Sequence, residues 1–298
     1  MLAVDADINQ HLASALGASA AEAGALPTLS GHLPLIKDYL RGTNPRIASA
    51  AVMVKTTPPG AGSRLLHLVE RNPIYEACVR EVGGVRLAVT GPFVESDLGV
   101  TCYHAKVGAV ELLLNHLIDG VGDYLVVDMT AGADSFASGL FTRFDLMFLV
   151  CEPTLRSVGV YRQHESYARD FGVRIAVVGN KVCDEQDVAF LRQHIGVNLV
   201  GWLSRSEHVR AAERGEIRPI SALEPANLAT LDTMRELADH TTKDWRTYQR
   251  QAVEFPLRNA AAWANDRTGG DLSEQIDPDF IPGPDALAWS GRIPSATS

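Results

Sequence analysis

Acidic residues follow two apolar runs of the sequence, where carboxylates can hold a metal ion. The stretch Tyr124 to Gly132 reads Y-L-V-V-D-M-T-A-G, so an apolar run ends at Asp128 and a small Ala-Gly pair follows. Met1 to Val4 is a shorter apolar run that leads into Asp5 and Asp7. Carboxylate oxygens bind Mg²⁺, which in turn binds phosphates. The alternatives are that Asp128 only begins a turn and that the other two acids cap a helix.

Alternating strand and helix patterns predict how these acids are positioned. Strand-like runs occupy 85–90, 124–127, 146–151, 174–178 and 198–203, and helical periodicity occupies 107–119, 157–170, 187–195 and 206–214. Such alternation predicts an α/β fold with a doubly wound, mainly parallel sheet flanked by helices. Sheets of this kind bind ligands at the carboxyl ends of their strands, which is where Asp128 lies.

The sequence suggests one α/β domain over 1–254 and a loosely ordered extension over 255–298. From about Phe255 onward Pro, Gly, Asp and Ser become frequent and periodicity fades. Before that point, 227–250 has the pattern of one long amphipathic helix. Near the start, a strand-like run at 50–55 precedes the glycine-containing stretch 57–63. We interpret 57–63 as a connecting loop rather than a phosphate loop, because it lacks a Gly-Lys-Ser/Thr ending and its two prolines have no N–H.

Composition and charge exclude several classes of protein. The chain has 298 residues, of which 46% are hydrophobic and 21% charged, and this is typical of a soluble globular protein. A net charge of -9 disfavours nucleic acid and anionic membrane surfaces as partners. No apolar run approaches the roughly 20 residues of a membrane span, and no secretory signal is present, so we expect a cytoplasmic location. Four cysteines without a CxxC pair argue against disulfides.

Four signals at the ends of strand patterns occur in a characteristic order along the chain. They are Asp5-x-Asp7, Asp128-x-x-Ala-Gly132, Glu152-Pro-Thr154 and Gly179-Asn-Lys181. From Leu2 to about Gly215 this order resembles the deviant P-loop ATPases of the Min, Par and nitrogenase iron protein group. Within that group the pattern is most similar to the CooC-like accessory ATPases, which insert nickel into carbon monoxide dehydrogenase. The resemblance implies a switch protein that binds and hydrolyses ATP, with Mg²⁺ as its metal ion. It also implies a homodimer that acts on a client protein or metalloenzyme.

The resemblance assigns roles to the acids and to one glycine. Asp128 and Asp5 would hold Mg²⁺ through water, and Asp7 would orient the attacking water. Gly132 would contact the γ-phosphate through its backbone N–H. Phosphoryl transfer depends mainly on positioning and charge neutralisation, so this set is chemically sufficient for those roles.

A second set of residues would bind the base. Asn180 matches the asparagine that hydrogen-bonds adenine, and the alternative is an asparagine that only forms a turn. Arg205, Ser206 and Val209 belong to the segment that closes over the base in the family.

The sequence departs from the family at one motif. Members place a strand and a Walker A loop before the residues matching Leu2 to Asp7, whereas no G-x-x-x-x-G-K-[ST] occurs in these 298 residues. Without that loop the phosphates lose their backbone cradle and lysines, so we expect weak ATP binding, and hydrolysis if the loop is restored. The alternatives are a truncated start, which we favour because the acids and Asn180 remain, and a nucleotide-free relative. The latter would be a catalytically inactive protein interaction module.

Cys102-Tyr-His104 suggests a further metal site. The family carries cysteines near this position, and two copies in a dimer would offer two thiolates and two imidazoles, which suit zinc or nickel. The alternative is that Cys102 packs in an interface while His104 makes an ordinary hydrogen bond.

Overall fold

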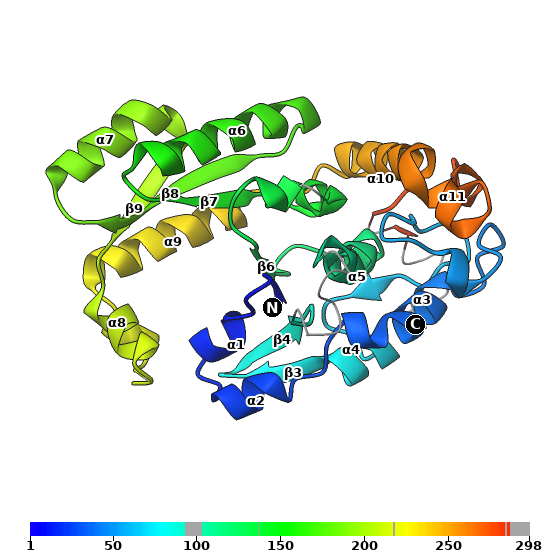
Figure 1. Ribbon diagram of the computed structural model, residues 1–298, viewed down its shortest axis with the longest axis horizontal. Helices are drawn as coiled ribbons and strands as arrows, with labels where there is room; N and C mark the ends of the chain where they lie inside the picture. The colour runs from blue at the N-terminus through cyan, green and yellow to red at the C-terminus, as the bar shows by residue number, and fades with distance from the viewer. Residues whose placement is uncertain (93–102, 137, 217, 284, 287–298) are drawn as a thin grey trace, which may run out of the picture. The chain divides into compact units, whose positions relative to one another are not determined.

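A computed structural model describes residues 1–92, 103–136, 138–216, 218–283 and 285–286 (Figure 1). The chain divides into two units, one made of 1–143 with 245–298 and the other of 144–244. Both units contain strands that are mainly parallel and flanked by helices, which confirms the predicted α/β fold class. No helix in the described residues is both long and apolar enough to cross a membrane.

The first unit is built on a sheet of order β3-β4-β1-β6. Strand β1 (Leu2–Ala6) lies between β4 (Val85–Val89) and β6 (Leu125–Met129), and both pairings are parallel. Strand β3 (Val79–Val82) pairs antiparallel with β4. All five residues of β1 are buried, as expected for the centre of a sheet covered on both faces.

Short helices surround this sheet, and a small second sheet accompanies it. The helices are α1 (Leu12–Ala15), α2 (Ala20–Gly24), α3 (Leu33–Arg41), α4 (Pro73–Cys78) and α5 (Tyr103–Asn115). Strands β2 (Leu66–His67) and β5 (Leu117–Ile118) form the second sheet. The strand expected over 50–55 is wrong: a 3-10 turn at Ala50–Val52 leads into a loop. Side chains bind this backbone in place of a strand partner, since Thr57 Oγ1 accepts from Val54 N and Asn115 donates to Lys55 O.

The residues after 244 return to the first unit and continue its helical structure. Helix α10 (Trp245–Asn259) crosses the expected boundary at 254, and a π-helical turn (Ala260–Ala264) and α11 (Asn265–Thr268) follow. Gln275 is buried, accepts a hydrogen bond from Thr57 Oγ1 at 3.0 Å and donates one to Val52 O at 3.1 Å. Hydrophobic contacts attach the segment as well, because Ala260, Ala264 and Leu272 form a buried cluster with Val54.

The second unit holds three parallel strands in the order β7-β8-β9. They are β7 (Met147–Cys151), β8 (Ile175–Val182) and β9 (Leu199–Ser204). Helices α6 (Leu155–Phe171) and α7 (Glu185–Ile195) cover one face and α9 (Pro225–Asp239) the other, with α8 (Glu207–Glu213) after β9 (Figure 1). The boundaries of these helices follow from their sequence: Thr154 caps α6 at its start, and Gly172 ends it in the left-handed conformation.

The long helix expected over 227–250 is two helices. Helix α9 ends at Asp239, and α10 begins at Trp245 in the other unit. The connecting stretch contains Thr241, whose hydroxyl donates to Leu237 O at 2.7 Å. Adjacent β-branched threonines have low helix propensity, and side-chain bonds of this kind compete with the helical ones.

Strands β6 and β7 each have one strand neighbour in the described residues, β1 and β8 respectively. Val126 of β6 is 52% exposed and Val150 of β7 is 62% exposed. Such apolar runs predict burial on both faces, so the sequence pattern overestimates how far these two strands are covered.

Candidate functional site

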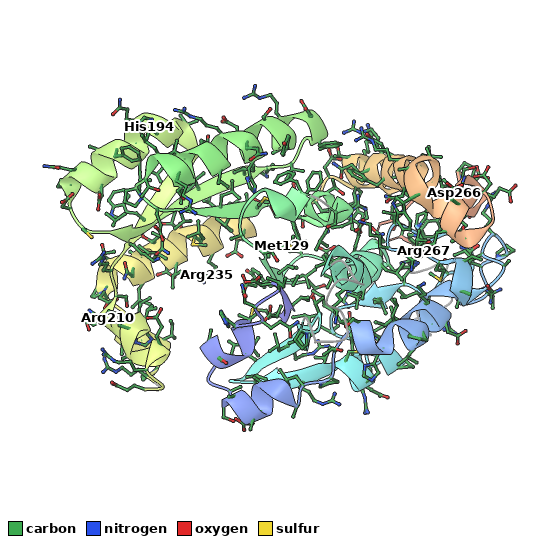
Figure 2. The ribbon with its side chains drawn as sticks, viewed as in Figure 1. Met129, His194, Arg210, Arg235, Asp266 and Arg267 are labelled. Carbon is green, nitrogen blue, oxygen red and sulfur yellow. The ribbon has the colours of Figure 1, made fainter. Side chains whose placement is uncertain are left out.

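The acids of the first unit converge because two parallel strands end together. Asp5 and Asp128 are directly paired in the register of β1 and β6, and Ala6 pairs with Met129 one residue later. Met129, labelled in Figure 2, ends β6 immediately after Asp128. The two residues that the resemblance assigns to one cation are therefore neighbours on adjacent strands.

Asp5 is fully buried and its carboxylate is held by backbone donors. Asp7 N donates to Oδ1 at 3.2 Å, and Leu12 N, at the start of α1, donates to Oδ2 at 3.0 Å. The backbone carbonyl of Asp5 accepts from both the N–H and the hydroxyl of Thr90, at 2.9 and 2.8 Å. Asp5 therefore accepts from the first residue of α1, although the N-cap of that helix is His11, and it does so while paired with Asp128 in the register of the two strands.

Asp128 contrasts with Asp5, because no donor in the described residues reaches its carboxylate. Partial burial, followed by the negative charges of Asp5 and Asp7, raises the pKa of Asp128 above its usual range. Burial likewise raises the pKa of Asp5, although its two backbone hydrogen bonds act in the opposite direction. His11 contributes a small opposing effect at both carboxyls. Three acids without a neutralising cation form a site at which positive charge is favoured.

The loop after β1 is tied to the loop after β6. Thr130 Oγ1 donates to Asp7 Oδ1 at 3.3 Å and accepts from Ile8 N at 3.4 Å. Asp7 Oδ1 also accepts from Asn9 N at 3.3 Å. These bonds fix one carboxylate oxygen of Asp7, whereas no described residue donates to the other.

Gly132 has the backbone conformation that the loop needs. Its φ of +86° lies in the left-handed region, which glycine adopts without strain, and its carbonyl accepts from the Ser135 hydroxyl at 3.1 Å. A Cβ at Gly132 would meet no heavy atom within 4 Å, so conformation rather than space explains the glycine. No described residue accepts from its N–H, which leaves this donor available to an anion.

The acid set fits a hydrated divalent cation better than a directly bound one. The described residues contain no group of three His, Cys, Asp or Glu side chains arranged to hold a metal ion. Mg²⁺ usually retains several waters and binds proteins through one or two carboxylates. The repulsion among Asp5, Asp7 and Asp128 would be relieved by such an ion, so the donor chemistry fits Mg²⁺.

In the second unit, Asn180 lies at an irregularity of β8. The register with β9 shifts between Gly179 and Val182, and Lys181 has a φ of +58°. Asn180 Oδ1 accepts from Lys181 N at 2.9 Å, while Lys181 Nζ pairs with Glu152 at 2.6 Å. Bulges redirect side chains near binding sites, and here the amide nitrogen of Asn180 receives no partner from the described residues.

The segment from Arg205 to Val209 follows the neighbouring strand, β9. Arg205 N donates to Val182 O at 3.3 Å, so the segment starts beside the end of β8. Ser206 caps α8 by accepting from Val209 N at 3.0 Å, and both Arg205 and Val209 are exposed. The predicted base-binding residues therefore lie on adjacent strand ends of one unit. Arg210 of α8 and Arg235 of α9 are labelled in Figure 2.

Sequence reasoning missed two residues that support these sites. Glu224 accepts from the N–H groups of Glu207 and His208, and the Ser206 hydroxyl is the main cause that lowers the pKa of Glu224 to about 2. Thr130 links the two acid loops. Neither residue belongs to a hydrophobic periodicity. The one sequence signal is that Thr130 lies within the motif D-M-T-A-G, between Asp128 and Gly132.

The suggested interface metal site falls largely outside the described residues. Cys102 is not described, and His104 lies in the first turn of α5 without a described side chain. The prediction for Cys102 and His104 stays untested.

Comparison with known proteins gives relatives and one structure with the same fold. The chain is 29% identical over 217 residues to the carbon monoxide dehydrogenase accessory protein CooC of Rhodospirillum rubrum, covering 72% of this chain and 76% of the relative. It is 28% identical over 137 residues to an uncharacterized ATP-binding protein of Methanocaldococcus jannaschii, covering 45% and 52%. No protein-family model matches the chain.

Among solved structures, a Borrelia burgdorferi B31 protein assigned to plasmid partition and bound to AMPPNP superimposes with a TM-score of 0.50. The alignment covers 79% of this chain and 85% of that one at 8% identity, which shows a shared fold alone.

Proposed function

Because this chain is a homologue of CooC and has the fold of the ParA and MinD type of P-loop ATPase, we propose that it is an ATP-dependent switch protein. The observation that carries the proposal is the register of Asp5 and Asp128. It places Asp128, whose carboxylate accepts no hydrogen bond from the described residues, beside the buried Asp5. A hydrated Mg²⁺ bound there would supply charge neutralisation for phosphoryl transfer.

The residues of the first unit would act on the phosphate end of the nucleotide. Asp128 and Asp5 would hold a hydrated cation, which would neutralise phosphate charge, and the N–H of Gly132 would donate to the γ-phosphate. Asp7 accepts a hydrogen bond from the attacking water. The water oxygen bonds to the γ-phosphorus, the bond from that phosphorus to the β,γ-bridging oxygen breaks, ADP leaves with the electron pair, and the water's proton passes to solvent.

The second unit would recognise the base. Asn180 presents an amide to adenine, and Arg205, Ser206 and Val209 lie on the neighbouring strand end. The cap from Ser206 and the bonds from Glu224 hold this segment in place.

A homodimer with an unidentified client protein or metalloenzyme completes the proposal, on the strength of the CooC homology. Cys102 and His104 are proposed to contribute to a zinc or nickel site between protomers. Metal analysis of the purified protein beside Cys102→Ser tests this part, and equal metal content in the two samples would reject it.

A second candidate function is an interaction module without hydrolysis. It is favoured by the absence of G-x-x-x-x-G-K-[ST] from these 298 residues, because that loop supplies most phosphate donors in P-loop proteins.

Turnover of Mg-ATP by the full chain distinguishes the two functions. Without a Walker A loop in these residues we expect phosphate release to be slow, to depend on Mg²⁺ and to fall at least about 10-fold in Asp7→Ala and Asp128→Asn. Asp232→Asn is the matched control, since Asp232 is an exposed acid on α9 that pairs with Arg235 and lies outside the proposed site. Turnover that is absent from the unaltered chain, or equal in all four proteins, would reject hydrolysis and favour the interaction module.

A further inference from the structure

Thr130 joins two loops that are separated by more than a hundred residues in sequence. It follows β6 by one residue and lies between Asp128 and Gly132. Its hydroxyl bonds to both Asp7 Oδ1 and Ile8 N, at 3.3 and 3.4 Å. The loop that carries the water-orienting acid, Asp7, is therefore connected to the loop that follows Asp128 and β6.

The hydroxyl has only one proton, and this fixes the direction of both bonds. Ile8 contributes an N–H, so Thr130 Oγ1 must be the acceptor in that bond. The single proton of Thr130 is then directed at Asp7 Oδ1, which requires the acid to accept. Asn9 N binds the same oxygen. Two donors on Oδ1 restrict rotation of the carboxylate and leave Oδ2 for a water.

We propose that Thr130 is a positioning residue for hydrolysis, which holds Asp7 so that its Oδ2 is aimed at the attacking water. This inference rests on the proposed ATPase function. Both bonds of Thr130 are near the long limit for hydrogen bonds, so they contribute little to folding stability. Their effect is on orientation, and a small misplacement of a catalytic group is costly to rate.

Two substitutions separate the hydroxyl from the shape of the side chain. Thr130→Val keeps the branched shape and removes the hydroxyl, whereas Thr130→Ser keeps the hydroxyl. We expect Thr130→Val to lower kcat about 10-fold and to change KM less than about 2-fold. Thr130→Ser should retain at least about half of the unaltered kcat. In an Asp7→Ala background, Thr130→Val should cost less than about 2-fold, because the group that it positions is gone.

Amide hydrogen exchange gives a second readout that needs no nucleotide. Thr130→Val should speed exchange at the Ile8 N–H by about 5-fold, corresponding to a lost hydrogen bond, and Thr130→Ser should not. The Leu12 N–H, which binds Asp5, is the internal control and should be unchanged.

The outcomes separate this inference from the function on which it rests. Turnover that is absent from the unaltered chain overturns the ATPase function, and the role of Thr130 with it. Turnover in the unaltered chain that Thr130→Val leaves unchanged overturns only the role of Thr130. The role of Thr130 is also overturned if Thr130→Val lowers kcat equally in the unaltered and the Asp7→Ala backgrounds, or if exchange at the Ile8 N–H is unchanged.

Discussion

Asp5 and Asp128 are paired across two parallel strands, and only Asp5 receives hydrogen bonds from the described protein residues. The carboxylate of Asp5 is thus fixed by the fold, whereas the carboxylate of Asp128 is left to bind a cation. Like charges in such proximity destabilise a sheet unless a cation offsets them.

Removing the Asp128 charge should stabilise the metal-free chain. Burial and then repulsion from Asp5 and Asp7 raise the pKa of Asp128, and Asp128→Asn removes both penalties on the charge, so we expect the free energy of unfolding at pH 7 to rise by about 0.5 kcal/mol. The gain should shrink as pH falls, because the unaltered Asp128 takes up a proton at higher pH in the folded chain than in the unfolded chain. Urea denaturation measures it, and a loss of stability at pH 7 would contradict the repulsion.

Replacing Asn180 should weaken binding of adenine nucleotides selectively. Asn180→Ala removes the amide at the bulge of β8 while sparing the fold, since its one described bond is to the adjacent Lys181 N. We expect ATP to bind about 10-fold more weakly and GTP to change little. Competition binding with both nucleotides is the measurement. Equal effects on the two nucleotides would show that Asn180 does not read the base.

Acid should destabilise the protein through His116. This side chain is fully buried, and burial lowers its pKa to about 4 while one Nδ1 bond to Leu112 O acts weakly in the opposite direction. The unfolded chain binds the proton near pH 6.5, so stability is complete above that pH and is lost as pH falls toward 4. The loss from this residue should reach about 2.5 kcal/mol at pH 4.5.

His116→Gln should flatten this pH dependence, whereas His240→Gln, at an exposed histidine after α9, should not. Denaturation with urea at pH 7 and pH 4.5 compares the three proteins. If all three proteins lose the same stability between pH 7 and pH 4.5, groups other than His116 control the sensitivity to acid.

The segment after 255 should contribute to stability. Gln275→Leu leaves the Thr57 hydroxyl and the Val52 carbonyl without their buried partner, so we expect a loss of about 2 kcal/mol. Glu274→Ala, at an exposed neighbour, is the control and should cost less than about 0.5 kcal/mol. If the two variants are equally stable, the segment is the loosely ordered extension that the composition indicates.

The sequence predicted those parts of the fold that depend on hydrophobic periodicity. Alternating runs located β4, β6, β7, β8 and β9 and the helices between them, whereas the placing of Asp5 beside Asp128 was implied by the family resemblance and not by the strand patterns. Prediction was wrong where side chains satisfy the backbone, as at 50–55, where Thr57 and Asn115 replace a strand partner.

Residues that act through one polar contact were also missed. Thr130 meets Asp7 across 123 positions, and Glu224 meets Glu207 across 17. Neither pairing leaves a periodic trace, because a single hydrogen bond fixes no repeat in the sequence. Such contacts require the folded chain to be seen.

Calorimetric titration of ATP into the full chain, with and without Mg²⁺ and beside Asp128→Asn, tests whether Asp5 and Asp128 form a cation site for the nucleotide. We predict saturable ATP binding that requires Mg²⁺ and is lost in Asp128→Asn. Its affinity should be weaker than micromolar, because these residues contain no Walker A loop. The matched control Asp232→Asn should bind as the unaltered chain does. Binding that is equal with and without Mg²⁺, or unchanged in Asp128→Asn, would contradict a cation site formed by these strand-end acids.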